Sequence, residues 1–161
     1  MVHPMSSASS RFSDFSADPQ LAQIKLPPHS LEAEQSLIGG ILLDNQAWER
    51  VADLVNEADF YRDDHRRIYR HITKLIDQGR PADAVTVFES LEKNGEAEQA
   101  GGLAYIAELA NNTPSAANIR RYAEIVRERA ILRKLVAVGD EIAASALSPS
   151  GKDAKALLDE A

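Results

Sequence analysis

The feature that most constrains the fold is the run from residue 116 to residue 147, which has no proline and a single glycine, Gly139. A helix of roughly 30 residues is about 45 Å long, far longer than the average helix of about a dozen residues. Just before this run, the hydroxyl of Thr113 can cap free N–H groups, and the fixed φ angle of Pro114 suits a first helical position. We therefore predict one long helix that starts at Thr113 and Pro114.

The apolar residues of this helix fall on two faces. Ile119, Tyr122 and Val126 share one face at the helical period, which suits packing on the helix's own domain. A second set follows a repeat close to seven residues, as coiled-coil seams do. It comprises Ile125, Leu132, Leu135, Val136 and Ile142. One core helix with a single broad apolar face is the alternative; we favour a helix that leaves its domain and uses this second set as an interface with a returning helix or another chain.

Composition excludes several classes of protein. The chain has 161 residues, 44% of them apolar, which is enough for one domain with a core or for a small head with an arm. The absence of cysteine excludes disulfides and thiolate chemistry and fits a cytoplasmic protein. No apolar run approaches the roughly 20 residues of a membrane span. A net charge of −7 argues against a protein that binds nucleic acid by charge alone.

The chain divides into four segments. Residues 1–23 are rich in Ser and have no helical or strand period, which predicts a disordered tail. Residues 24–112 have the caps, periods and stops of about five short helices, and they predict a small all-α head. Residues 113–147 form the long helix or helical-hairpin arm. Residues 148–161 begin as a linker and continue as an amphipathic helix that ends in mid-pattern, which predicts the start of a linker helix in a longer protein.

Helix starts in the head are indicated by side chains that suit N-caps. They are Ser30, Asp44 and Asp83, before the first, second and fourth predicted helices. The third helix is predicted over about residues 64–78. Gly101 and Gly102 open a fifth helix. We expect its Leu103 and Leu109 to face the core.

Gly39 and Gly40 interrupt the apolar pattern of the first helix, where each glycine costs about 1 kcal/mol relative to alanine. We interpret the pair as a point of close approach between helices. A phosphate-binding glycine loop is the alternative, but such a loop follows a strand, and no strand is predicted before this pair.

No catalytic, cofactor-binding or metal-binding residue is predicted. The sequence Ser-Gly-Lys at residues 150–152 lacks both the earlier glycine and the following Ser or Thr of a nucleotide-binding P-loop. His65 and His71 are six residues apart and do not share a helical face, which favours solvated or core-edge histidines over a metal site.

Basic residues on the long helix outnumber their acidic neighbours. The candidates for contacts with DNA or with an acidic partner are Arg120, Arg121, Arg127 and Lys134. The alternative is a solvated face whose charges pair at i,i+4 spacing.

Several ordered blocks resemble one family, the N-terminal domain of the bacterial replicative DNA helicase DnaB. The blocks are LPPHSLEAEQS at 26–36, GG at 39–40, DFY at 59–61, GGLAYIAEL at 101–109, NTPSAANI at 112–119 and YAEIVRE at 122–128. They extend the resemblance over about residues 21–161. Because the blocks are many and occur in order, they are far more specific than a single motif.

This resemblance implies a helical head with an arm whose pairing makes dimers, and three dimers form a collar above a ring of ATPase domains. The collar binds the C-terminal domain of primase, and members of the family also engage helicase loaders. Single-stranded DNA passes through the ring during ATP-driven 5′-to-3′ unwinding. The ATP and Mg²⁺ sites belong to the ATPase domain, which the resemblance places after Ala161. The expected location is the cytoplasm, at the replication fork.

Two hypotheses follow. The chain is an assembly and docking domain of a replicative helicase, which predicts self-association and primase binding without nucleotide. Alternatively, it is a helical module that contacts single-stranded DNA, which predicts binding that weakens steeply with salt. An enzymatic function of this segment would need a P-loop or a paired acid–base site, and the sequence has neither.

Overall fold

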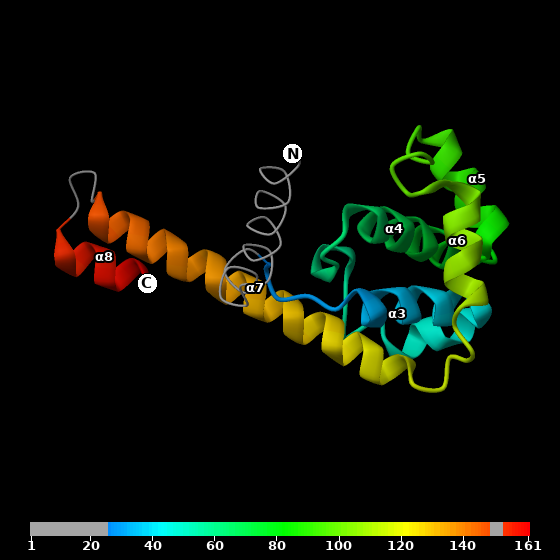
Figure 1. Ribbon diagram of the computed structural model, residues 1–161, viewed down its shortest axis with the longest axis horizontal. Helices are drawn as coiled ribbons and strands as arrows, with labels where there is room; N and C mark the ends of the chain where they lie inside the picture. The colour runs from blue at the N-terminus through cyan, green and yellow to red at the C-terminus, as the bar shows by residue number, and fades with distance from the viewer. Residues whose placement is uncertain (1–25, 149–152) are drawn as a thin grey trace, which may run out of the picture.

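The helices form a head at one end of the molecule and an arm that extends away from it (Figure 1). The computed structural model describes residues 26–148 and 153–161, so the predicted tail at 1–23 and most of the predicted linker lie outside the described residues. The helical elements are α3 (Leu31–Leu43), η1 (Asn45–Arg50), η2 (Glu57–Asp59), α4 (Asp63–Asp77), α5 (Ala84–Lys93), α6 (Gly102–Asn111), α7 (Ile119–Leu147) and α8 (Ala154–Glu160). The described residues form no strand, which confirms the predicted all-α fold.

Hydrogen bonds from side chains explain where two head helices begin. The Ser30 hydroxyl accepts a hydrogen bond from the Ala33 N–H at 3.3 Å, at the start of α3. Asp83 and Thr86 form a reciprocal capping box at the start of α5. Each cap satisfies N–H groups that have no partner within the helix. Both starts agree with the sequence prediction.

The second predicted helix is instead the short 3₁₀ segment η1, which is followed by turns. Asp44 does cap it, because its side chain accepts a hydrogen bond from the Gln46 N–H at 3.0 Å. The side chain of Asn45 exchanges two hydrogen bonds of 2.8 Å with the backbone of Ala82. These bonds connect η1 to the segment between α4 and α5. Because the two segments are far apart in sequence, a local sequence pattern cannot predict this contact.

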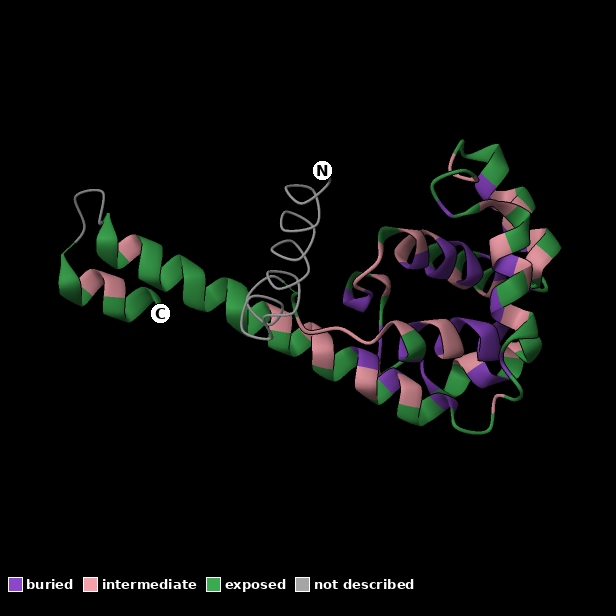
Figure 2. Cartoon of the chain, in the orientation of Figure 1, coloured by how far each residue is buried: buried purple, intermediate pink, exposed green. Residues whose placement is uncertain are grey.

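The core of the head is built around α3, which packs against α4, α6, α7 and η1. Leu37, Ile38 and Ile41 of α3 are fully buried, and Figure 2 shows part of α3 in the colour of buried residues. The first turns of α7 add buried Ile119 and Val126 to the same core. The base of the predicted arm therefore belongs structurally to the head.

The two glycines of α3 mark a close approach between helices, as predicted. A Cβ atom on Gly39 would lie 2.3 Å from the carbonyl oxygen of Leu109, near the end of α6. A Cβ atom on Gly40 would lie 3.1 Å from Cδ1 of Ile119 in α7. The first of these separations is shorter than any real contact of such atoms, so α6 can approach α3 this closely only because residue 39 has no side chain.

The long helix begins at Ile119, so the predicted start at Thr113 and Pro114 is wrong. The Thr113 hydroxyl is buried and donates a hydrogen bond backward to the Leu109 carbonyl at 2.9 Å, at the end of α6. It therefore satisfies a carbonyl at the C-terminus of one helix instead of the N–H groups of the next. From Ile119, α7 continues without interruption through Gly139. No described helix is both long and apolar enough to cross a membrane.

Leu103 was expected in the core but is 40% exposed, whereas Ile106 and Leu109 on the same helix are buried. The helix α6 begins only at Gly102, so Leu103 lies in its first turn. The three residues share a face by their spacing, but the packing partner does not extend along the whole face.

A partly buried ion-pair cluster joins α4 to the turn after α5. Glu96 accepts a hydrogen bond from His71 Nε2 at 2.7 Å and ion-pairs with Arg67 at 2.7 Å and with Arg70 at 3.3 Å. The hydrogen bond from His71 and the nearby Arg67 guanidinium lower the pKa of the Glu96 carboxyl.

We expect Glu96→Gln to lower stability at neutral pH and to flatten the acid side of the pH–stability curve. A carboxyl whose pKa is lower in the folded state stabilises the fold above its ordinary pKa of 4.5, and this contribution disappears as the pH falls through the lowered value. Urea unfolding at a series of pH values measures the change. Glu92→Gln, on the exposed side of α5, is the control, and equal curves for the two variants would exclude this role of Glu96.

Candidate protein-interaction surfaces

The free part of the arm is mostly exposed (Figure 2). It carries large apolar side chains that the other described residues do not cover. Four of the five predicted interface residues are in this set. They are Leu132 at 38% exposure, Leu135 at 62%, Val136 at 52% and Ile142 at 44%. The fifth, Ile125, is half-buried and packs against the core of the head. The structure therefore separates Ile125 from the other four.

The helix α8 folds back beside the last turns of α7 (Figure 1). An open groove of about 510 Å³ lies between them, and its apolar lining includes Val138, Ile142, Leu157 and Leu158. A returning helix is thus present at the tip of the arm. Leu132, Leu135 and Val136 do not line this groove, and they lie exposed further along the arm toward the head.

The four predicted basic contact residues differ in their surroundings. Arg120 and Arg121 both pair with Glu124 on the exposed face of α7, at 3.7 Å and 3.5 Å. Arg127 pairs with the buried carboxylate of Asp59 at 3.1 Å. Lys134 has no carboxylate within ion-pair distance among residues 26–148 and 153–161. Two of these cations therefore share one carboxylate on the same helix, as in the solvated-face alternative.

An elbow, formed by Pro28, Asp59, Tyr61, Arg127 and Arg133, fixes the arm to the head where α7 leaves the core. The Arg133 guanidinium donates hydrogen bonds to the carbonyl oxygens of Pro28 at 2.8 Å and Asp59 at 2.6 Å. It also lies over the Tyr61 ring, 5.5 Å from the centroid. Because these contacts are with backbone groups and a ring far away in sequence, no pattern in α7 distinguishes Arg133 from the other arginines.

The buried polar centre of the head consists of Glu34, His65 and Tyr105. The Glu34 carboxylate accepts hydrogen bonds from the Tyr61 N–H at 2.8 Å and from the Arg62 N–H at 3.4 Å, and it lies 2.8 Å from His65 Nδ1. The other ring nitrogen of His65 lies 2.7 Å from the Tyr105 hydroxyl. One consistent assignment has Nδ1 donate to Glu34 and the Tyr105 hydroxyl donate to Nε2.

This centre was missed from the sequence, and both histidines are more buried than expected. His65 and His71 are almost fully buried, so they are neither solvated nor at the edge of the core. Their hydrogen-bond partners lie outside α4, and those hydrogen bonds offset the cost of burying a polar ring. The helical period did contain a signal for Glu34, which shares a face with Leu37, Ile38 and Ile41.

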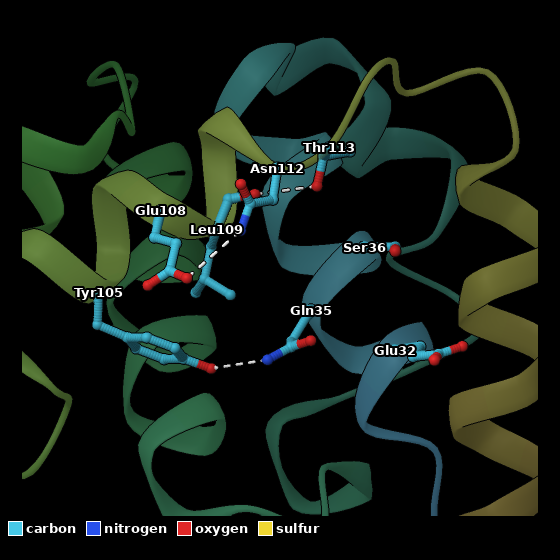
Figure 3. Close-up of a pocket in the computed structure, with 8 residues that line it drawn as sticks. All are labelled: Glu32, Gln35, Ser36, Tyr105, Glu108, Leu109, Asn112 and Thr113. Carbon is cyan, nitrogen blue, oxygen red and sulfur yellow. Dashed lines mark hydrogen bonds between the residues drawn. The ribbon is translucent and has the colours of Figure 1, made fainter.

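A polar hollow of about 360 Å³ lies between α3 and α6 (Figure 3). Tyr105 and Gln35 face each other across it, and the Gln35 amide donates to the Tyr105 hydroxyl at 3.3 Å. Glu32 and Glu108 also line the hollow, but no histidine, cysteine or lysine is among its lining residues to complete a catalytic pair. The part of the chain that the structure describes has no group of three residues suited to bind a metal ion.

Comparison with known proteins identifies the family. The profile described as "DnaB-like helicase N terminal domain" matches residues 26–128. The chain belongs to this DnaB family. A replicative DNA helicase DnaB of Haemophilus influenzae is 49% identical over 146 residues, which cover 91% of this chain and 31% of the relative. The DnaB of Geobacillus stearothermophilus is 37% identical over 142 residues, again 31% of its length. The chain therefore spans about a third of the length of these DnaB relatives.

Solved structures agree with this family and with the predicted fold. The crystal structure of the N-terminal domain of DnaB helicase from Mycobacterium tuberculosis matches with a TM-score of 0.80 and 39% identity, covering 84% of this chain and 94% of that one. A second structure is described as a DnaB-like replicative helicase and its interactions with primase. It matches with a TM-score of 0.62 and 25% identity, over 80% of this chain and 30% of that one.

Proposed function

We propose that this domain assembles the replicative helicase through its arm and docks primase. The observation that supports self-association most is the row of exposed Leu132, Leu135, Val136 and Ile142 on a helix that extends beyond its own core. Exposed apolar residues gathered on one element are typical of protein interfaces, since burying them supplies the free energy of association. We propose arm-paired dimers, three of which make a hexamer.

Primase is the proposed partner because a related DnaB-like replicative helicase is described with its interactions with primase. The partner segment is expected to be the C-terminal domain of primase. We also propose that the assembled protein engages a helicase loader and passes single-stranded DNA through its ring at the replication fork. What supports both of these proposals is the match to the DnaB family.

The chemistry of unwinding is proposed to reside in other parts of the full-length protein. The relatives are about three times as long as this chain, which leaves room for a separate domain that binds ATP and Mg²⁺. We propose that this chain contributes assembly and recruitment and binds no nucleotide itself. Titration of the isolated domain with Mg²⁺ and ATP tests this directly by calorimetry.

We expect Leu132→Asp to dissociate the arm pair while leaving the head folded. A carboxylate in the middle of a buried apolar seam loses its hydration without gaining a partner, and association becomes unfavourable. Sedimentation velocity of the domain, alone and mixed with primase, measures the change in mass. The wild-type chain should sediment as a dimer or larger, and faster still with primase.

Ala137→Asp is the matched control, because it adds the same charge five residues further along α7. At about 3.6 residues per turn this position lies on a different face of the helix, and it is exposed. The control should sediment like the wild type. Loss of helical circular dichroism in Leu132→Asp would instead place Leu132 in the core, and binding of single-stranded DNA without primase binding would favour the DNA-contacting alternative.

A further inference from the structure

A basic cavity of about 540 Å³ lies at the elbow, between η2 and the middle of α7. Its lining residues are Asn56, Ala58, Asp59, Arg127, Ala130, Ile131, Arg133 and Lys134. Three of these are cations, and Asp59 is the single carboxylate among them. The cavity is therefore positive in a chain whose net charge is −7.

Two of the three positive charges have no carboxylate partner among the described residues. Asp59 pairs with Arg127. Arg133 is satisfied by carbonyl oxygens and a ring, which hold its guanidinium in place without neutralising its charge. Lys134, next to it in the chain, is exposed and pairs with no described carboxylate. The cavity thus has one cation held in place by other contacts and one exposed cation available to an incoming anion.

The same cavity has an apolar wall, which favours a protein partner over a nucleic-acid strand. Ala130 and Ile131 line it, and Ile131 is 46% exposed. A phosphate backbone has no aliphatic group for such a wall, and an acidic protein repels a nucleic acid at long range. A peptide segment in which carboxylates stand beside an aliphatic side chain satisfies both parts of the surface.

We infer that the elbow cavity docks an acidic segment of primase that also carries an aliphatic side chain. This inference rests on the proposed function, which it makes more specific. The carboxylates contact Lys134 and Arg133, and the aliphatic side chain packs on Ile131. Since Arg133 is already held by Pro28 and Asp59, little conformational freedom is lost at that position when the partner binds. Arg120 and Arg121 lie outside the cavity.

The test measures binding of fluorescently labelled primase to the domain and to Lys134→Glu. Replacing a cation that faces carboxylates by a carboxylate should raise the dissociation constant about tenfold or more. Arg120→Glu is the matched control: it makes the same change in charge on the same helix, at an exposed position outside the cavity. The control should shift the dissociation constant less than about twofold.

Two further measurements sharpen the test. Raising the salt concentration from about 0.01 M to about 0.1 M shortens the Debye length from about 30 Å to about 10 Å, so wild-type binding should weaken, and Lys134→Glu should weaken less. Lys134→Gln, which removes the charge without reversing it, should lie between the wild type and Lys134→Glu. It also replaces Lys134→Glu if that variant fails to fold by circular dichroism.

Equal losses in Lys134→Glu and Arg120→Glu would overturn the inference, because a general charge effect explains them. Primase binding that is unchanged in Lys134→Glu would also overturn the inference. So would a result in which Lys134→Glu weakens binding of a labelled single-stranded oligonucleotide but not binding of primase. If the wild-type domain binds no primase, the proposed function itself fails and the inference falls with it. That result differs from one in which the wild-type domain binds primase and Lys134→Glu binds it equally well.

Discussion

Gly39→Ala is expected to destabilise the head by about 3 kcal/mol or more, a large share of the stability of an ordinary domain. The added methyl group would lie 2.3 Å from the Leu109 carbonyl oxygen and 2.1 Å from the Thr113 hydroxyl. The first neighbour is backbone and cannot rotate away. The hydroxyl could turn only by giving up its hydrogen bond to Leu109. Thermal and urea unfolding followed by circular dichroism measure the loss.

Gly139→Ala is the matched control, because it makes the same substitution in a helix interior with open space around it. Alanine is the better helix former, so this variant should gain up to about 1 kcal/mol. If Gly39→Ala were as stable as the wild type, α3 and α6 would have to separate with no loss of packing, and the close approach could not be important for stability.

Glu34→Ala is expected to have the second largest effect, a loss of about 3 kcal/mol or more. The substitution leaves two partly buried backbone N–H groups and one buried histidine nitrogen without their acceptor, and a fully buried group in this state costs about 1–3 kcal/mol. It also removes the partner that orients His65 toward Tyr105. Glu34→Gln keeps one acceptor oxygen and should lose less. Urea denaturation of the three proteins ranks them.

Glu32→Ala, two residues earlier in the same helix turn, is the control. It tests whether the loss at position 34 comes from the buried hydrogen bonds of Glu34 or from removing any glutamate there. Glu32 is exposed and lines the open hollow between α3 and α6, so its loss should change stability by less than about 0.5 kcal/mol. Similar losses at positions 32 and 34 would mean that the α3 N-terminus needs any carboxylate near its dipole, and that the hydrogen bonds of Glu34 add nothing specific.

Local patterns predicted the parts of the fold that local forces determine. Ser30 and Asp83 cap helices because the groups they satisfy lie within the next few residues. The fold class and the family were likewise available from the sequence, since helical periods and ordered blocks are properties of sequence alone. Gly39 was informative because a glycine in a helix interior has a cost that only packing can offset.

The errors come from groups whose partners are distant in sequence. Thr113 looked like an N-cap, but its hydroxyl bonds to the helix before it. The histidines looked like surface or edge residues, but each meets a carboxylate from another element. Arg133 did not stand out among the arginines of its helix, although it makes the contacts that hold the elbow. The candidate interface residues and the primase contacts stay predictions until the measurements above are made.

Because the elbow holds only the base of α7, a small rotation there moves the free end of the helix by a larger distance. From Arg127 to Leu147 the helix extends about 30 Å, so a rotation of about 10° at its base displaces its tip by about 5 Å, close to the pitch of one helical turn. Arg133 holds the base by bonds to two backbone segments. A small angular difference at this point is therefore magnified into a larger displacement at the far end. In the proposed arm-paired assembly, the hydrogen bonds of Arg133 would set how precisely the arms of several copies meet.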